Sequence, residues 1–143
     1  MNLVIDASVL IKFYVPEILS AKAERLLAKV GNKNIDLFAP DLIYPEVGNI
    51  LWKKHRLKEL THSEVEEITD AILTLHLKIE PSRPLIPLAL DIAIVYGITV
   101  YDAIYVSLAN VYETTMMTAD RKLIDALGRT DLRDSVTWLG SYK

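Results

Sequence analysis

Four acidic side chains suggest the chemistry of this chain, and the first of them is Asp6. Apolar residues 3–5 precede it and residues 9–11 resume the apolar run, so the pattern predicts a buried strand that ends at a carboxylate. An unpaired carboxylate is costly to bury. Asp6 therefore needs either a charged partner or a chemical purpose.

Each of the other three acids follows a strand-like segment: Glu46 comes after residues 36–40, Asp102 after residues 98–100 and Asp120 after residues 114–119. In an open parallel sheet the carboxyl ends of the strands lie at one edge, where the functional crevice forms. We therefore expect the four carboxylates to gather on one side of the sheet.

Clustered carboxylates repel one another unless a cation compensates their charge. Mg²⁺ or Mn²⁺ suits such a cluster because these hard cations prefer oxygen ligands. A site of this kind activates water and stabilises the charge that builds up on a phosphodiester during its displacement. The formal net charge of −3 argues against a protein that holds nucleic acid mainly through a basic surface, but phosphates can be drawn to bound metal instead.

Three of the acids also have a purely structural interpretation. Asp102 completes a capping pattern with Thr99, and Asp120 is suited to cap a helix over residues 121–127. Glu46 on a helix would ordinarily be solvated. Asp6 is the hardest of the four to explain this way, because apolar residues flank it on both sides.

Polar neighbours of these acids are candidates for supporting roles. Asn49 and Lys53 follow Glu46 by three and seven residues, on nearly the same helical face, so one could orient a water and the other reach a phosphate. Ser8 and Thr118 each lie two residues from an acid and could hydrogen-bond to it. Hydroxyls beside strand ends more often serve turns and caps, and Asn49 could equally be an ordinary polar residue of a helix, so both alternatives stay open.

Apolar strand candidates alternate with helical patterns along the whole chain. Strands are predicted at residues 3–5, 36–40, 77–81, 98–100, 114–119 and 136–139. Helices are predicted at residues 21–30, 41–57, 61–77, 84–97, 101–113 and 120–128. This order predicts a single α/β domain of residues 1–143, with a central, mostly parallel sheet of four to five strands flanked by helices on both faces.

Local signals refine this outline. Asp41 is a candidate N-cap, Thr61 and Glu64 form a capping-box pattern, and segment 84–97 is predicted to be a largely buried helix that ends at Gly97. Several tyrosines lie within apolar patterns and are assigned to core packing: Tyr96, Tyr101, Tyr105 and Tyr112. The amphipathic segments 17–30 and 61–76 are candidates for a dimer or partner surface.

The absence of cysteine excludes disulfides, thiolate catalysis and cysteine-based zinc sites. No signal peptide or membrane-spanning segment is expected, because Asp6 interrupts the first apolar run and the longest other run contains Pro87, Asp91 and Gly97. These features favour a cytoplasmic protein without a membrane partner.

Four segments in this order resemble the acidic motifs of PIN-domain ribonucleases: VIDASVLIKFY, PEVGNIL, TVYDAIYVSLA and TADRKL. The short form of the chain is similar to the VapC toxins of prokaryotic toxin–antitoxin pairs. The resemblance implies that Asp6, Glu46, Asp102 and Asp120 bind Mg²⁺ or Mn²⁺ and that RNA is cut endonucleolytically. It also implies a homodimer and a cognate VapB-like antitoxin whose C-terminal segment blocks the site.

Some members of that family carry a further acid shortly after the fourth motif acid, whereas here Asp125 comes only a turn later. The occupancy of a second metal position is therefore left open. Two other functions also remain open: an aspartyl-nucleophile phosphohydrolase, which would need an acid where Ser8 stands, and a non-catalytic interaction protein that keeps the PIN fold.

Overall fold

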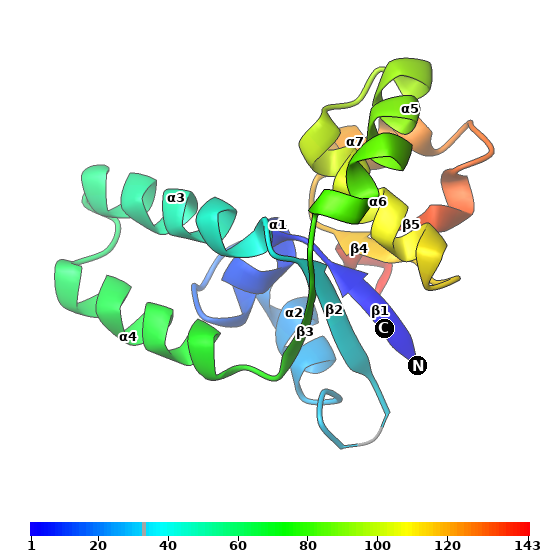
Figure 1. The fold of residues 1–143 in the computed structure, drawn as a ribbon. Helices are drawn as coiled ribbons and strands as arrows, with labels where there is room; N and C mark the ends of the chain where they lie inside the picture. The colour runs from blue at the N-terminus through cyan, green and yellow to red at the C-terminus, as the bar shows by residue number, and fades with distance from the viewer. Residues whose placement is uncertain (33) are drawn as a thin grey trace.

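The computed structural model describes residues 1–32 and 34–143, in which strands and helices alternate from end to end (Figure 1). The strands are β1 (Asn2–Ile5), β2 (Asp36–Pro40), β3 (Leu77–Glu80), β4 (Met116–Thr118) and β5 (Val136–Trp138). The α-helices are α1 (Ala7–Leu10), α2 (Ser20–Leu27), α3 (Ile43–Arg56), α4 (His62–Thr74), α5 (Ile86–Tyr96), α6 (Val100–Val111) and α7 (Arg121–Leu127). Short 3-10 helices are η1 (Ile11–Phe13), η2 (Arg83–Leu85), η3 (Arg133–Ser135) and η4 (Leu139–Ser141).

The strands of the described residues form one five-stranded sheet in the order β3-β2-β1-β4-β5, and every pairing is parallel. In the centre, Val4 of β1 lies opposite Phe38 on one side and Met116 on the other. The chain first builds outward from β1 to β3, then crosses to β4 on the far side of β1. Ligands of open α/β sheets bind outside the carboxyl ends of the strands at such a reversal.

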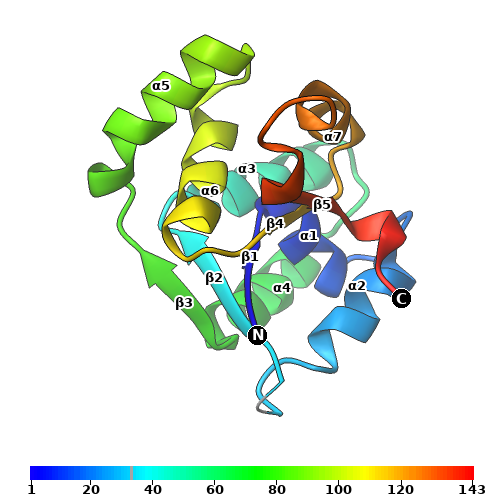
Figure 2. The same ribbon diagram turned by 90° about the vertical axis from the view of Figure 1, so that its right-hand side faces the viewer.

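Helices cover both faces of this sheet, so the predicted α/β architecture is confirmed. Helix α6 packs against β1, β2 and β4, and α5 packs outside α6. Helix α2 packs against η1 and lies away from α5 and α6 in both ribbon views (Figures 1 and 2). Helices α3 and α4 pack against each other and extend beyond the sheet (Figure 1). The predicted capping box at the start of α4 is present, with Thr61 and Glu64 bonded reciprocally.

The strand predicted at residues 98–100 is wrong. Gly97 ends α5 in the left-handed conformation, with φ of 68°, and Val100 already begins α6. Only Gly97, Ile98 and Thr99 separate the two helices, and Thr99 caps α6 by accepting a hydrogen bond from the amide of Asp102 at 3.1 Å. The β-branched residues suggested a strand, but the cap leaves no length for one.

Two further local predictions are wrong. Asp41 does not cap α3, which begins at Ile43 after Leu42; its carboxylate accepts hydrogen bonds from the amide of Ser82, at 3.1 Å, and from that serine's hydroxyl. The helix predicted at 84–97 forms as α5, but it is not largely buried. Only Ala89 and Ile92 of α5 are buried, because this helix packs on the outer side of α6.

Exposed apolar residues of α5 are Leu88, Leu90, Ile94 and Val95. Within the described residues, no single helix is long and apolar enough to cross a membrane. Two helical stretches together reach that composition, Arg83–Tyr96 and Val100–Val111, but they are bent by 116° relative to each other.

Candidate functional site

Asp6 lies between β1 and α1 at the carboxyl edge of the sheet, where it is buried with 7% of its surface exposed. Its Oδ1 accepts hydrogen bonds from the hydroxyl of Ser8 at 2.5 Å and from the amide of Val9 at 3.1 Å. Its Oδ2 accepts one from the hydroxyl of Thr118 at 2.5 Å. All three donors are neutral, so they satisfy the oxygens without compensating a negative charge.

The environment of Asp6 therefore disfavours its ionised form. Burial raises the pKa of this carboxyl from 3.8 to about 6, and the negative charge of Asp102 acts in the same direction. The hydrogen bonds from Ser8, Thr118 and Val9 lower the pKa and limit the rise. Without a cation nearby, the carboxyl takes up a proton at mildly acidic pH.

Two hydroxyls connect the start of α1 with the carboxyl end of β4: Ser8 lies in α1, and Thr118 is the last residue of β4. Ser8 Oγ accepts a hydrogen bond from the amide of Ala119 at 2.9 Å, and Thr118 Oγ1 accepts one from the amide of Asp120 at 3.0 Å. Both hydroxyls also donate to Asp6, so the start of α1 and the end of β4 are held together around one carboxylate. This network fixes the main chain of Asp120 relative to Asp6.

Asp120 caps α7, as its structural interpretation predicted. Its Oδ1 accepts hydrogen bonds from the amide of Lys122 at 2.9 Å and, less closely, from the amide of Leu123 at 3.4 Å. A carboxylate offers about four lone-pair directions. The cap therefore leaves oxygen sites on Asp120 available for another ligand.

Glu46 lies in the first turn of α3 and is half-buried. Its Oε1 accepts a hydrogen bond of 2.5 Å from the hydroxyl of Tyr105, which reaches it from α6. Burial raises the pKa of Glu46, and the charge of Asp102 raises it further. The hydrogen bond from Tyr105 acts in the opposite direction.

Asp102 lies in the first turn of α6 rather than after a strand. Burial raises its pKa, the hydrogen bond with Thr99 opposes this, and the charge of Asp120 raises it again. Asp102 is thus close enough to Asp6, Glu46 and Asp120 for repulsion to act in each pair. Asp102 is thus the one acid that takes part in all three of these repulsive pairs.

Among the described residues, no cationic side chain pairs with any of these four acids. None of the ion pairs within residues 1–32 and 34–143 involves Asp6, Glu46, Asp102 or Asp120. The donor set consists of carboxylate oxygens, which suits a hard divalent cation. In the described part of the chain, however, no three acidic or histidine side chains already converge closely enough to hold a metal ion. The donor chemistry fits a metal, and the side chains would have to close around it.

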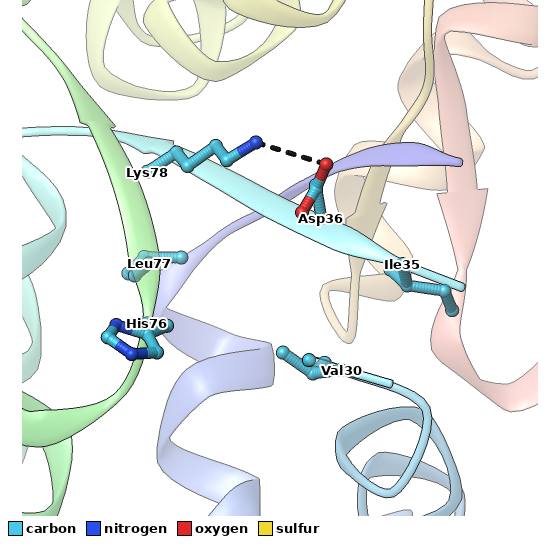
Figure 3. A pocket seen from close by; sticks show the side chains of 7 residues that line it. Val30, Ile35, Asp36, His76, Leu77 and Lys78 are labelled. Carbon is cyan, nitrogen blue, oxygen red and sulfur yellow. Dashed lines mark ion pairs between the residues drawn. The ribbon is translucent and has the colours of Figure 1, made fainter. Parts of the chain in front are cut away.

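A separate hollow lies at the opposite edge of the sheet, at the amino ends of β2 and β3 (Figure 3). It has a volume of about 320 Å³ and is lined by Val30, Gly31, Ile35, Asp36, His76, Leu77 and Lys78. Its charged groups pair with each other, since Lys78 Nζ lies 3.0 Å from Asp36 Oδ2 and both side chains are exposed. None of the four candidate acids lines this hollow.

Comparison with known proteins identifies the family. The model of the PIN domain matches residues 3–128. The chain belongs to the PIN domain family. Ribonuclease VapC3 from Pyrobaculum aerophilum is 35% identical over 127 residues, which cover 87% of this chain and 94% of that protein.

Two solved structures resemble this PIN domain in fold. A protein from Pyrobaculum aerophilum superimposes with a TM-score of 0.70 at 23% identity, covering 98% of this chain and 85% of its own. A toxin–antitoxin complex from Klebsiella pneumoniae gives a TM-score of 0.64 at 13% identity, covering 94% and 95%.

In this PIN domain the four supporting candidates fall into two groups. Ser8 and Thr118 hydrogen-bond to Asp6, whereas Asn49 and Lys53 are exposed on α3 and make no hydrogen bond to an acid within the described residues. Their roles in function stay predictions.

The acid that follows the fourth candidate is also exposed. The carboxylate of Asp125 lies 3.4 Å from the guanidinium of its neighbour Arg121, one turn away on α7. This arrangement gives no support to Asp125 as a ligand of a second metal.

One contact of a tyrosine in this PIN domain was not predicted from the sequence. Tyr105 is buried, as its assignment to the core predicted, but its hydroxyl bonds to Glu46. A signal was available, because Tyr105 lies three residues after Asp102 on one helical face. The same core assignment is wrong for Tyr101, which is 62% exposed in the first turn of α6.

Proposed function

We propose that this protein is a metal-dependent endoribonuclease that acts as the toxin of a type II toxin–antitoxin system. The PIN domain match and the 35% identity to a ribonuclease over most of both chains support the nuclease. The fold shared with a protein of a toxin–antitoxin complex supports the toxin role. RNA is the proposed substrate, hydrolysed by an activated water.

One observation carries the metal requirement. Three of the four candidate acids, Asp6, Glu46 and Asp102, have a raised pKa, and no ion pair of the described residues compensates any of the four. Carboxylates that repel one another at the active edge of a sheet remain ionised at neutral pH when a cation binds between them. Mg²⁺ or Mn²⁺ held by these acids would supply that charge, together with the Lewis acidity to polarise a phosphodiester and lower the pKa of water.

Each acid has a proposed role in this site. Asp6, Asp102 and Asp120 hold the cation, and Glu46 holds either the cation or the attacking water. Ser8 and Thr118 keep the carboxylate of Asp6 in one orientation through the two 2.5 Å hydrogen bonds. A fixed ligand loses less conformational freedom when it engages the metal or substrate.

The exposed face of α3 is proposed to contact the RNA. Lys53 lies two turns after Glu46 and is free in solvent to reach a phosphate. Asn49 lies between them, one turn from Glu46, where its amide could orient a water or a phosphate oxygen. These contacts position the backbone of the RNA and carry no base specificity.

A VapB-like antitoxin is the proposed protein partner, and its C-terminal segment is proposed to block the acidic site. We further propose that the chain acts as a homodimer in the cytoplasm. The amphipathic helices α2 and α4 are the first candidates for these contacts, as their sequences suggested.

The residue at position 8 argues against the aspartyl-nucleophile alternative. That chemistry places a general acid two residues after the nucleophile. Here the serine hydroxyl instead donates to Asp6 at 2.5 Å, which orients the carboxylate but supplies no acid.

RNA cleavage tests the proposal directly. The wild-type protein is incubated with RNA in Mn²⁺, in Mg²⁺ and in EDTA, alongside Asp102→Asn and the matched control Asp91→Asn. Asp91 is an exposed acid on α5 and lies outside the site. We expect cleavage only with metal, a loss of about 100-fold or more in Asp102→Asn, and wild-type rates in the control.

Cleavage that survives EDTA, or that is unchanged in Asp102→Asn, would contradict the mechanism. If the wild type binds no Mn²⁺ and cuts no RNA, the protein is instead a non-catalytic member of the PIN family.

A further inference from the structure

Two tyrosine hydroxyls, one from α6 and one from the residue that directly follows it, donate short hydrogen bonds to glutamates. Tyr105 donates to Glu46 Oε1 at 2.5 Å, and Tyr112 donates to Glu80 Oε1 at 2.5 Å. The bonds match in donor, acceptor and length, but only the first ends at one of the candidate acids. The chain therefore contains its own control for the loss of one tyrosine hydroxyl.

The hydroxyl of Tyr105 is a fixed point in the fold. The side chain is 1% exposed, and it projects from a helix that packs against β1, β2 and β4. A buried tyrosine has two side-chain torsions, both restricted by packing. Its oxygen is therefore held by the core rather than by the residue that it contacts.

Glu46 lacks such a constraint of its own. Its carboxylate stands at the end of three torsions in the first turn of α3, and the negative charge of Asp102 repels it. Among the described residues, Tyr105 is the only hydrogen-bond donor to this carboxylate. Without that bond, repulsion and side-chain entropy both favour movement of Glu46 away from the other acids.

We propose that Tyr105 is a positioning residue, which holds Oε1 of Glu46 and leaves Oε2 as the oxygen that engages the divalent cation or the attacking water. This inference rests on the proposed function of the acidic site. It makes Oε2 the preferred oxygen for that contact, because Oε1 already accepts the hydrogen bond from the core. Tyr105 itself touches neither the metal nor the RNA.

Replacing each tyrosine by phenylalanine tests the proposal. Tyr105→Phe removes one hydroxyl and keeps the buried ring, and Tyr112→Phe does the same at the matched bond. For RNA cleavage we expect kcat to fall about 10-fold or more in Tyr105→Phe with KM changed less than about twofold, because a hydrogen bond to a charged group is lost. Tyr112→Phe should keep kcat within about twofold of wild type.

A double substitution shows whether Tyr105 acts through Glu46. Adding Tyr105→Phe to Glu46→Gln should produce no further fall in kcat, since residues that act as a unit are not additive. A further fall of about 10-fold would show that Tyr105 acts independently and would overturn the positioning role.

Two readouts do not depend on cleavage. Mn²⁺ affinity, measured without RNA by electron paramagnetic resonance, should weaken about 10-fold in Tyr105→Phe and stay unchanged in Tyr112→Phe. In metal-free crystals, the Glu46 side chain should leave its position in Tyr105→Phe but not in Tyr112→Phe.

These readouts separate the two proposals. If the wild type cuts no RNA, the proposed function fails, and the position of Glu46 in the crystals still decides the role of Tyr105. Equal behaviour of Tyr105→Phe and Tyr112→Phe in every readout would overturn the positioning role of Tyr105.

Discussion

Two regions of this molecule place a carboxylate in opposite electrostatic environments. Glu17 lies between two lysines: Lys12 Nζ is 2.7 Å from its Oε2, and Lys54 pairs with its Oε1. Asp6, by contrast, receives hydrogen bonds only from neutral donors among the residues that the structure describes. Helix α3 makes the contrast sharper, because it carries both Glu46 and Lys54 and places the lysine against Glu17.

The two regions differ in pKa accordingly. Partial burial pushes the pKa of Glu17 upward, but the hydrogen bonds and charges of Lys12 and Lys54 outweigh burial and lower it overall. At Asp6 burial dominates and raises the pKa to about 6. Glu17 receives its cations from two lysines of the chain, whereas no ion pair of the described residues involves Asp6, Glu46, Asp102 or Asp120. Under the proposed function, a bound divalent cation would supply the missing charge at this site.

The largest expected effect is on the pH dependence of stability without metal. The native carboxyl of Asp6 binds a proton more tightly than the unfolded one, whose pKa is 3.8. Its contribution to stability is therefore complete below about pH 4 and is lost as pH rises through about 6. Relative to Asp6→Asn, the wild type should lose on the order of 3 kcal/mol between these limits in EDTA.

Urea denaturation at a series of pH values measures this difference. The control Asp91→Asn should run parallel to the wild type throughout. Parallel curves for the wild type and Asp6→Asn would show that Asp6 already has a cation within the chain, and the comparison with Glu17 would fail.

The next effect is stabilisation by added metal. Mn²⁺ at about 100 times its Kd should raise the free energy of unfolding by about 2.7 kcal/mol in the wild type, because it binds only the folded state. Glu17→Gln should gain the same increment, since its charges lie outside the site. Asp6→Asn should gain little or nothing.

Thermal melts with and without Mn²⁺ give this result directly. Ca²⁺ provides a check on selectivity, because it takes more ligands at longer distances than Mg²⁺ does. An equal Mn²⁺ increment in Asp6→Asn would place the cation elsewhere on the protein.

The sequence predicted those features that depend on neighbouring residues. The apolar flanks of Asp6, the capping box at Thr61 and the stop at Gly97 were each sufficient to predict a local structure that is present. Periodicity also identified the parallel α/β class, because the strands are apolar rather than alternating.

The features that could not be predicted from the sequence depend on contacts between distant elements. The bond between Tyr105 and Glu46 joins residues 59 positions apart and exists only once α6 packs near α3. The exposure of α5 could not be inferred because an apolar helix has the same sequence whether it is covered or not. At residues 98–100 a helix cap prevailed over β propensity, which depends strongly on context.

The smallest expected effect concerns Glu17, and it tests whether the lysines that pair with this carboxylate stabilise the fold. In Glu17→Gln the ammonium groups of Lys12 and Lys54, whose side chains are only 12% and 18% exposed, lose their shared carboxylate. We expect a loss of about 1–2 kcal/mol in the free energy of unfolding at neutral pH, because partly buried charges are left with weaker partners. Lys54 keeps a second contact to Glu59 at 3.3 Å, which limits the loss.

The contribution of Glu17 to stability should depend on pH in the opposite direction to the contribution of Asp6. The pKa of Glu17 is lowered from 4.5, so its contribution is present above that value and disappears as pH falls through the native pKa. Urea denaturation of the wild type and Glu17→Gln should therefore converge in acid, while RNA cleavage at neutral pH stays within about twofold. If cleavage instead falls as far as in Asp102→Asn, the ion pairs of Glu17 hold α3 and its Glu46 in place, and the two regions act as one.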